Sequence, residues 1–466
     1  MDIILKNTKS RKRSRILCSI FSLRSMYLQI KTNKLTQINC LEIMKGLNYL
    51  KRSFSAYYDE NKDHLPKVDS FNSREFGFIP WGMNIMKRHL SFIDVKSLSE
   101  YLVNKSPRHV YSSGSIYSHP DYQKMSIKEY QGCDFIVDID VDHFFTSCKD
   151  DHDFWKCKQC DQSGSGFPPQ KCPKCGSLKL NKLSWICENC LDVAKNEIRK
   201  LIYDFLIPDL GIKTESMKIA FSGHRGYHLK IIDEKIRTLS SAERRDLVDY
   251  FTGNNISFEI LGLKKIGSKI YGLNKGNIGW SNKIMKWFEE FLQTSNNNQI
   301  EEFLLKAGLI QKSIQNFIKS KNYILSSLSG NSKNVWNVDY MGIKSWKYLL
   351  KSIVTEICVE LDEPVSIDIH RLIRYPGSLH GQTGFKVQEL PFEKFNEFRP
   401  LNELEKQYDP VVFESRNTIK IEITSERVPF TKLKDQKYGP YEQGEKVEVP
   451  NHVAIFLVAK GVAEII

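Results

Sequence analysis

The sequence predicts an α+β fold that contains a cysteine-rich insertion and a largely helical segment. Strand and helix patterns mix without strict alternation, which disfavours a doubly wound parallel sheet. A polar, cysteine-rich stretch occupies 145–190, and apolar residues at helical spacing dominate 236–355. The pattern therefore separates segments of mixed strand and helix signals, up to about 235 and from about 356, from the cysteine-rich insertion at 145–190 and the helical segment at 236–355.

The first 43 residues differ from the rest in charge. No acidic residue lies between Asp2 and Glu42, and a basic start precedes the short apolar run "ILCSIFSL". A signal peptide would share these features, but no convincing small-residue cleavage site follows. We expect a disordered basic extension or a start-site error with Met44 as the true start, which the intact mass of the native protein would decide.

The chain as a whole is basic, with 68 Lys and Arg against 55 Asp and Glu, a net charge of +13. This surplus favours polyanions such as nucleic acid or nucleotides, although it also serves solubility. Its apolar runs are far shorter than the ~20 residues that a membrane helix needs. The composition therefore predicts a globular protein with no membrane contact.

The main-domain elements follow from periodicity. Helices are predicted over "MKGLNYLKRSFSAYYDE", "VKSLSEYLVNK" and 190–210, and extended chain over "HVYSSGSIY". "MKIAF" and "YHLKII" are predicted strands joined by the turn "SGHRG". A helix cap is expected at Ser240 or Ser241, and short strands are expected within 364–389 and at 419–424.

The stretch "DFIVDIDVDHF" (134–144) begins with a predicted strand, 134–142, that has an unusual charge pattern. Because side chains alternate between strand faces, Asp138, Asp140 and Asp142 are predicted to share one face, ~6.6 Å apart in succession. Their repulsion is unfavourable unless a divalent cation such as Mg²⁺ or Mn²⁺ binds them. Paired ions of this kind serve nucleotidyl transfer. The alternative is a solvated edge strand that uses charge against aggregation.

Two glycine-rich stretches contain groups that bind phosphate. "FSGHRGYHLKI" offers donors at Ser222, Arg225 and His228 beside glycines that let the backbone approach a ligand. "LDEPVSIDIHRLIRYPGSLHGQTGFKV" (361–387) adds carboxylates and a basic turn. Taken singly, the first could be an ordinary hairpin, and the second a turn with a surface salt bridge.

Eleven cysteines include three Cys-x-x-Cys pairs, which in a lysine-rich chain favour metal in a reducing cytosol over disulfides. "CKQC", eleven residues and then "CPKCG" have the spacing of a zinc ribbon. Its predicted ligands are Cys157, Cys160, Cys172 and Cys175. The third pair, Cys187 and Cys190, needs other ligands.

In combination, "REFGF" (74–78), "DIDVD" (138–142), "SGHRGYH" (222–228) and "RLIRYPGSLHGQTG" (371–384) resemble the catalytic small subunit of archaeal and eukaryotic DNA primases, the archaeal branch best. The resemblance runs from about Met44 to the C-terminus. It implies a primase catalytic domain on a β-sheet framework over 44–235 and 356–466, with a zinc-binding insertion at 145–190. A helical subdomain at 236–355 would be inserted between the second and third motifs.

The resemblance assigns roles to single residues. It maps the metal-binding aspartate pair to Asp138 and Asp140, and the third carboxylate to Asp362, with Asp368 as its rival. Asp142 lies outside the family pair. The implied nucleotide-binding residues are Ser222, Arg225, His228, Arg374 and His380, followed by Arg74, Glu75 and Arg88.

The family also has a zinc site built from an early Cys/His group and a later Cys-x-x-Cys that opens a helix. Here its ligands would be Cys148, His152, Cys187 and Cys190. With the ribbon, two structural zincs are predicted; the alternative is one zinc with shuffled ligands. Neither is expected to be catalytic, because a closed four-ligand site leaves no position for substrate.

The implied activity is de novo synthesis of short RNA primers from NTPs on single-stranded DNA, with two Mg²⁺ or Mn²⁺ ions. The implied partner is a separate large subunit with an iron–sulfur cluster, and the implied location is the archaeal cytoplasm at the replisome. One alternative is a related polymerase that mainly extends primers with deoxynucleotides. Another, of a different class, is a non-catalytic zinc-ribbon scaffold that binds nucleic acid.

Overall fold

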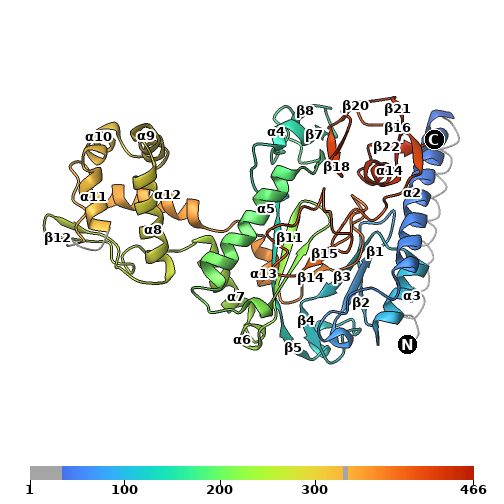
Figure 1. Cartoon of the computed structure of the whole chain (residues 1–466), viewed down its shortest axis with the longest axis horizontal. Helices are drawn as coiled ribbons and strands as arrows, with labels where there is room; N and C mark the ends of the chain where they lie inside the picture. The colour runs from blue at the N-terminus through green and yellow to red at the C-terminus, as the bar shows by residue number, and fades with distance from the viewer. Residues whose placement is uncertain (1–33, 329–333) are drawn as a thin grey trace, which may run out of the picture.

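A computed structural model describes residues 34–328 and 334–466. Two four-stranded antiparallel sheets lie at the centre, with helices on their outer sides, and a group of helices stands apart at one end (Figure 1). The predicted α+β fold is confirmed. Positions 1–33 of the predicted extension lie outside the described residues, and α2 (Lys34–Glu60) runs through the expected boundary at Met44.

The first central sheet has the strand order β14-β3-β1-β2. Helices α2 and α3 pack against it, and Phe54, Phe76 and Leu98 are buried in the shared core. The bounds are β1 Phe76–Ile79, β2 Lys87–Leu90, α3 Val95–Lys105, β3 His109–Ser113 and β14 Leu372–Arg374. Since β14 lies inside the segment 371–384, this sheet carries one of the predicted basic turns.

The second central sheet has the order β15-β10-β11-β6 and carries the aspartates. Phe135, Val137 and Ile139 form its buried face, as the alternating pattern predicts. Helix α5 and the π-helical turn 201–206 pack against that face. The bounds are β6 Phe135–Asp140, α5 Glu188–Lys200, β10 Met217–Phe221, β11 Gly226–Ile231 and β15 Gln388–Leu390.

The cysteine-rich insertion forms a small sheet of its own, in the order β8-β7-β9. The hairpin β4–β5 precedes β6, and the short helix α4 leads into the insertion. The bounds are β4 Ser115–Tyr117, β5 Tyr130–Cys133, α4 Lys149–His152, β7 Phe154–Cys157, β8 Ser163–Ser165 and β9 Leu180–Leu183.

The segment predicted as a helical subdomain has two parts. Ser240 caps α7 in a reciprocal arrangement with Glu243, as expected. Helix α7 packs on the second sheet, where the Phe251 and Phe135 rings lie 6.3 Å apart. The helices from α8 to α12 stand apart from the central sheets, together with the β12–β13 hairpin (Figure 1). The bounds are α6 Glu234–Arg237, α7 Ser241–Thr252, β12 Lys264–Ile266, β13 Lys269–Tyr271, α8 Gly279–Thr294, α9 Asn297–Lys306, α10 Gln311–Lys319, α11 Lys321–Leu328 and α12 Ile343–Ile357.

The C-terminal part adds a three-stranded sheet in the order β21-β16-β22. The apolar stretch near the end forms α14, whose Ile455 and Val458 pack on Leu50 of α2. Among the described helices, none is long and apolar enough to cross a membrane. The bounds are α13 Glu363–Ile367, β16 Thr418–Ile423, β17 Arg427–Val428, β18 Thr431–Leu433, β19 Gln436–Tyr438, β20 Tyr441–Glu442, β21 Lys446–Pro450, α14 Asn451–Ala459 and β22 Ala463–Ile465.

Candidate active site

Three predicted carboxylates come together at the end of β6. Asp138 and Asp140 occupy alternate positions on the strand, and the backbone N–H of Asp362 donates to the carbonyl of Asp138 at 2.9 Å. Burial, then the charges of Asp140 and Asp362, raise the pKa of Asp138 to about 7. Such a cluster of carboxylates is a suitable ligand set for hard divalent cations.

The rival carboxylate, Asp368, lies at the other end of α13. Its side chain is exposed and accepts a hydrogen bond from the backbone N–H of His370 at 2.8 Å. The geometry therefore favours Asp362 as the third member of the cluster, and its role in metal binding stays a prediction.

The prediction that Asp142 shares the strand face is wrong. The strand ends at Asp140, whose carboxylate accepts the N–H of Asp142 at 2.9 Å and starts a 3₁₀ turn over 141–143. The turn directs the Asp142 carboxylate to an ion pair with Arg225. Carboxylate oxygens of Asp140 and Asp142 and a ring nitrogen of His224 still lie within 4.8 Å of one another.

The turn between β10 and β11 is held against the carboxylates by sheet register. Gly226 pairs with Asp140 and His228 with Asp138, so that His228 Nε2 lies 3.5 Å from an Asp138 oxygen. Burial, then the charge of Arg374, lower the pKa of His228 to about 3. At neutral pH His228 is therefore an uncharged hydrogen-bonding group. An added Cβ at Gly226 would lie 2.1 Å from the Ile139 carbonyl, so the close pairing requires glycine.

The two glycine-rich turns touch each other. Gly223 has φ +81°, and a Cβ added there would lie 2.7 Å from that of His380. The Thr383 hydroxyl donates to the Gly223 carbonyl at 2.6 Å. Ser222 and His380 are both buried beside this contact. The structure thus brings residues of the second and third predicted motifs into one site.

A cavity of about 270 Å³ lies between the two central sheets. Its lining includes His228 of one sheet and Arg374 of the other, together with Lys218 and Lys230. Asp69 and Glu389 also line the cavity, but four basic side chains (Lys67, Lys218, Lys230 and Arg374) outnumber them, which suits a polyanionic ligand.

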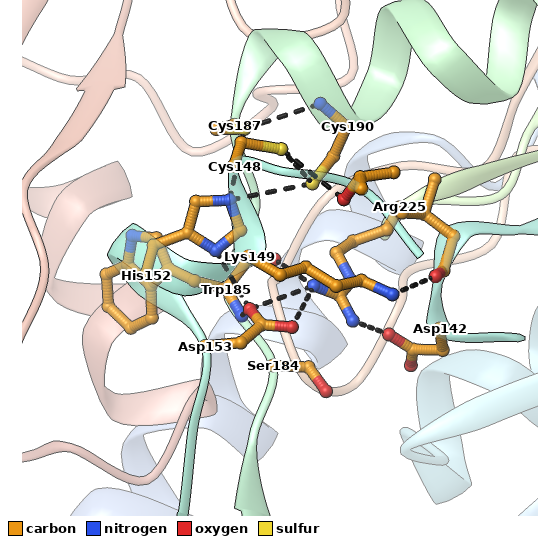
Figure 2. Close-up of polar contacts among 12 residues, drawn as sticks. Asp142, Cys148, Lys149, His152, Asp153, Ser184, Trp185, Cys187, Cys190 and Arg225 are labelled. Atoms are coloured by element: carbon orange, nitrogen blue, oxygen red, sulfur yellow. Dashed lines mark hydrogen bonds and ion pairs between the residues drawn. The ribbon is translucent and has the colours of Figure 1, made fainter. Parts of the chain in front are cut away.

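Arg225 is fully buried and held by acidic partners (Figure 2). Its Nη1 donates to both carboxylate oxygens of Asp153, at 2.9 and 2.7 Å, and to the Trp185 carbonyl at 3.0 Å. Its Nη2 faces Asp142. A triphosphate contact would require exchange of these partners, so the predicted phosphate role of Arg225 stays a prediction.

The predicted residues of "REFGF" lie in buried networks. Arg74 pairs with Asp134 at 2.7 Å, and Glu75 pairs with Lys128 and with Arg88, both at 2.9 Å. Arg88 also donates to the carbonyl of His370 at 3.0 Å, which links this network to the chain before β14. These contacts support the sheet, and nucleotide binding by the three residues stays a prediction.

The inner cysteine cluster, Cys148, His152, Cys187 and Cys190, has its ligand atoms within 4.8 Å of one another. The shortest separations are 3.2 Å from His152 Nε2 to Cys187 Sγ and 3.4 Å between the sulfurs of Cys148 and Cys190. A tetrahedral zinc with Zn–S bonds of ~2.3 Å needs sulfurs about 3.8 Å apart. The four side chains therefore fit a zinc ion.

The outer cysteine cluster consists of Cys157, Cys160, Cys172 and Cys175, and its four sulfurs also lie within 4.8 Å of one another. Its sulfurs pair at 3.6 Å, Cys157 with Cys175 and Cys160 with Cys172. Both predicted ligand sets are thus assembled, and both could bind zinc.

Asp153 connects the inner cluster to the candidate active site, and sequence reasoning did not identify it. Its Oδ1 lies 2.8 Å from His152 Nδ1, on the ring edge opposite the one that faces the sulfurs, and also accepts the N–H of Trp185 (Figure 2). A carboxylate that orients a zinc-binding histidine is a common supporting contact. The only sequence signal was its position next to His152.

Clustered carboxylates beside basic, glycine-rich turns on an α+β fold are typical of enzymes that use metal ions to transfer phosphoryl or nucleotidyl groups. A family model described as DNA primase small subunit matches residues 179–390. The chain is 31% identical to the DNA primase small subunit PriS of Methanothrix thermoacetophila over 445 residues, covering 90% of this chain and 99% of the relative.

Two further relatives agree. The PriS of Methanococcoides burtonii is 31% identical over 438 residues, with 90% and 99% of the two chains covered. That of Nitrosopumilus maritimus is 29% identical over 421 residues, with 90% and 98% covered. The chain therefore belongs to the DNA primase small subunit family, whose function by homology is nucleotidyl transfer.

Proposed function

We propose that the chain is the catalytic subunit of an archaeal primase, which makes short RNA primers de novo on single-stranded DNA. The observation that carries the proposal is the convergence of Asp138, Asp140 and Asp362 beside His228. Like charges at this density are unfavourable unless cations bind them. The family relationship supports the same reaction.

The three carboxylates are the proposed ligands of two Mg²⁺ or Mn²⁺ ions. When bound, the ions would activate the attacking hydroxyl and stabilise the leaving phosphate. The 3′-hydroxyl of the primer, or of the first nucleotide, attacks the α-phosphate of the incoming NTP. The new P–O bond forms as the bond to the β-phosphate breaks, and pyrophosphate leaves.

The triphosphate lies against the two touching turns in this proposal. Ser222 and neutral His228 contribute hydrogen bonds, and Arg374 contributes charge. Positioning and charge neutralisation supply most of the catalysis in such a site. The remaining proposed triphosphate contacts are Arg225 and His380. We also propose that Arg74, Glu75 and Arg88 contact the nucleotide or the primer.

Both cysteine clusters are proposed to hold structural zinc, two ions per chain. The proposed partners are a separate large subunit, the single-stranded DNA template and the RNA primer, and the proposed location is the cytoplasm at the replisome. The "small subunit" in the names of the relatives supports the first partner.

The test uses purified chain, alone and with the large subunit, on unprimed single-stranded DNA with labelled ATP, all ribonucleotides and Mg²⁺ or Mn²⁺. Short oligoribonucleotides that vanish in Asp138→Ala support the proposal. Asp362→Ala and its matched control Asp368→Ala decide the third ligand: only the first is expected to lose synthesis.

Two outcomes contradict the proposal. Extension of primed template with dNTPs alone indicates a deoxynucleotide-extending relative, which competition of ATP against dATP identifies. DNA binding without product under either metal, even with the partner, indicates a non-catalytic scaffold.

A further inference from the structure

Three buried histidines form a row beside the carboxylate cluster. The His224 and His380 rings stack at 5.1 Å, and the His109 ring meets His380 edge-on at 4.9 Å. Their side chains come from the β10–β11 turn, the turn after β14, and β3. We call these three residues the histidine row. Two cations terminate it, Arg374 at one end and Lys460 at the other.

The two cations donate into the row. Arg374 Nη1 lies 2.7 Å from His109 Nδ1, and Lys460 Nζ lies 2.7 Å from His224 Nε2. Because ammonium and guanidinium groups have no acceptor, the ring nitrogens must accept. Burial and these positive charges hold the pKa of all three histidines well below its usual range. The row is therefore neutral and joins two basic side chains, Arg374 and Lys460.

Lys460 follows directly after α14, at the end of an otherwise apolar stretch. Its ammonium donates to the Ser184 carbonyl at 2.6 Å and to His224, and neither partner is an anion. Burial, then the charge of Arg225, lower the pKa of Lys460 to about 7. The Lys460 side chain is partly buried, and a cation whose hydrogen-bond partners are both neutral is stabilised when an anion binds beside it.

The position of Lys460 links it to the metal-binding carboxylates. A ring nitrogen of His224 lies within 4.8 Å of a carboxylate oxygen of Asp140, and Lys460 contacts the same ring. A phosphate bound to a cation at Asp140 would therefore lie within reach of the Lys460 ammonium. None of the sequence motifs includes this lysine, because it lies 236 residues from His224.

We propose that Lys460 is a further phosphate-binding residue, which contacts the pyrophosphate portion of the nucleotide together with the histidine row. This rests on the proposed function. The competing explanation is a purely structural tie between the chain after α14 and the Ser184 loop. The two explanations differ in the charge that they require at position 460. A structural contact needs only a hydrogen-bond donor, whereas phosphate binding needs a cation.

The test compares Lys460→Gln, which keeps a donor and loses the charge, with Lys460→Arg, which keeps the charge. Lys446→Gln on β21 is the matched control, since that side chain is 65% exposed. Pyrophosphate binding with Mn²⁺ is measured by calorimetry, and the KM for ATP by primer synthesis with the large subunit. Thermal unfolding is measured for each variant.

Lys460→Gln is expected to weaken pyrophosphate binding and to raise the KM for ATP by about 10- to 100-fold, the effect of one charge-assisted hydrogen bond. The kcat should change less than about threefold, and Lys460→Arg should recover most of the binding. Lys446→Gln should match the wild type.

Unchanged pyrophosphate affinity in Lys460→Gln would overturn the inference. The inference would also be overturned if Lys460→Gln and Lys460→Arg lost the same pyrophosphate affinity and both had a lowered Tm, because a purely structural contact predicts that pattern. The proposed function fails separately, if the wild-type chain makes no primers. Pyrophosphate binding is measured without turnover, so the two failures are distinguishable.

Discussion

The two cysteine clusters have similar ligand geometry but different surroundings. In the outer cluster Cys175 is exposed, and all four ligands belong to the small β7–β9 sheet and its loops. The inner cluster is largely buried, and His152 is joined through Asp153 to Arg225 on the turn facing the carboxylates. One cluster stabilises a local fold, and the other is part of the scaffold of the candidate active site.

Between the two clusters, the larger effect is expected from disrupting the inner one. Cys187→Ser with Cys190→Ser should lower the zinc content by one ion per chain, lower the Tm and reduce primer synthesis by at least about 100-fold, because removing a ligand exceeds the usual effect of losing an outer contact. Metal analysis, thermal unfolding and synthesis assays check this. Normal synthesis by the variant would remove the functional difference between the clusters.

Asp153→Asn tests whether the inner cluster affects primer synthesis through the contact between Asp153 and Arg225. The variant keeps the shape but removes the negative charge beside buried Arg225, which is costly. We expect full zinc content, a lower Tm and a roughly 10- to 100-fold higher KM for NTP. Exposed Asp151→Asn is the matched control. A KM equal to that of the control would show that Arg225 does not depend on Asp153.

Asp138→Asn, which lies outside both cysteine clusters, is expected to raise the stability of the metal-free protein, whereas the cluster variants lower it. The raised pKa, about 7 against an ordinary ~3.9, means that the folded metal-free protein binds one more proton than the unfolded chain between these values. Stability conferred by the wild-type group is thus lost as pH rises from about 4 to 7. The variant should lack synthesis yet have a higher metal-free Tm at pH 8, with no gain at pH 4. A lower Tm at pH 8 would contradict the predicted repulsion.

The smallest effect is expected at the outer cluster. Cys172→Ser with Cys175→Ser should also remove one zinc per chain, but synthesis should stay within about threefold of the wild type, as for changes far from a functional site. Equal losses from the two double variants would contradict the comparison.

Sequence reasoning worked where function is encoded locally. The alternation of "FIVDID" fixed which face of β6 is polar, and cysteine spacing identified the outer cluster. The match to the primase family supplied His152 and Cys148, which spacing alone left open.

The remaining features depend on contacts between distant segments. Asp142 was misplaced because one side-chain hydrogen bond ends the strand, and alternation cannot detect such a bond. Asp153 contacts Arg225 across 72 residues, and Lys460 contacts His224 across 236. No periodic pattern links residues at such separations, so only the folded chain could reveal them.

The pairing of His228 with Asp138 has a consequence for how the chain tolerates changes in length. One residue added to the 222–226 turn would shift β11 against β6, and an aromatic or core position would then face the carboxylates. The same addition after β8, between Phe167 and Cys172, would lengthen a loop in which Gln170 and Lys171 are exposed, at small cost. Natural length variation should therefore concentrate in the zinc-ribbon insertion, while the length of the 222–226 turn stays constant.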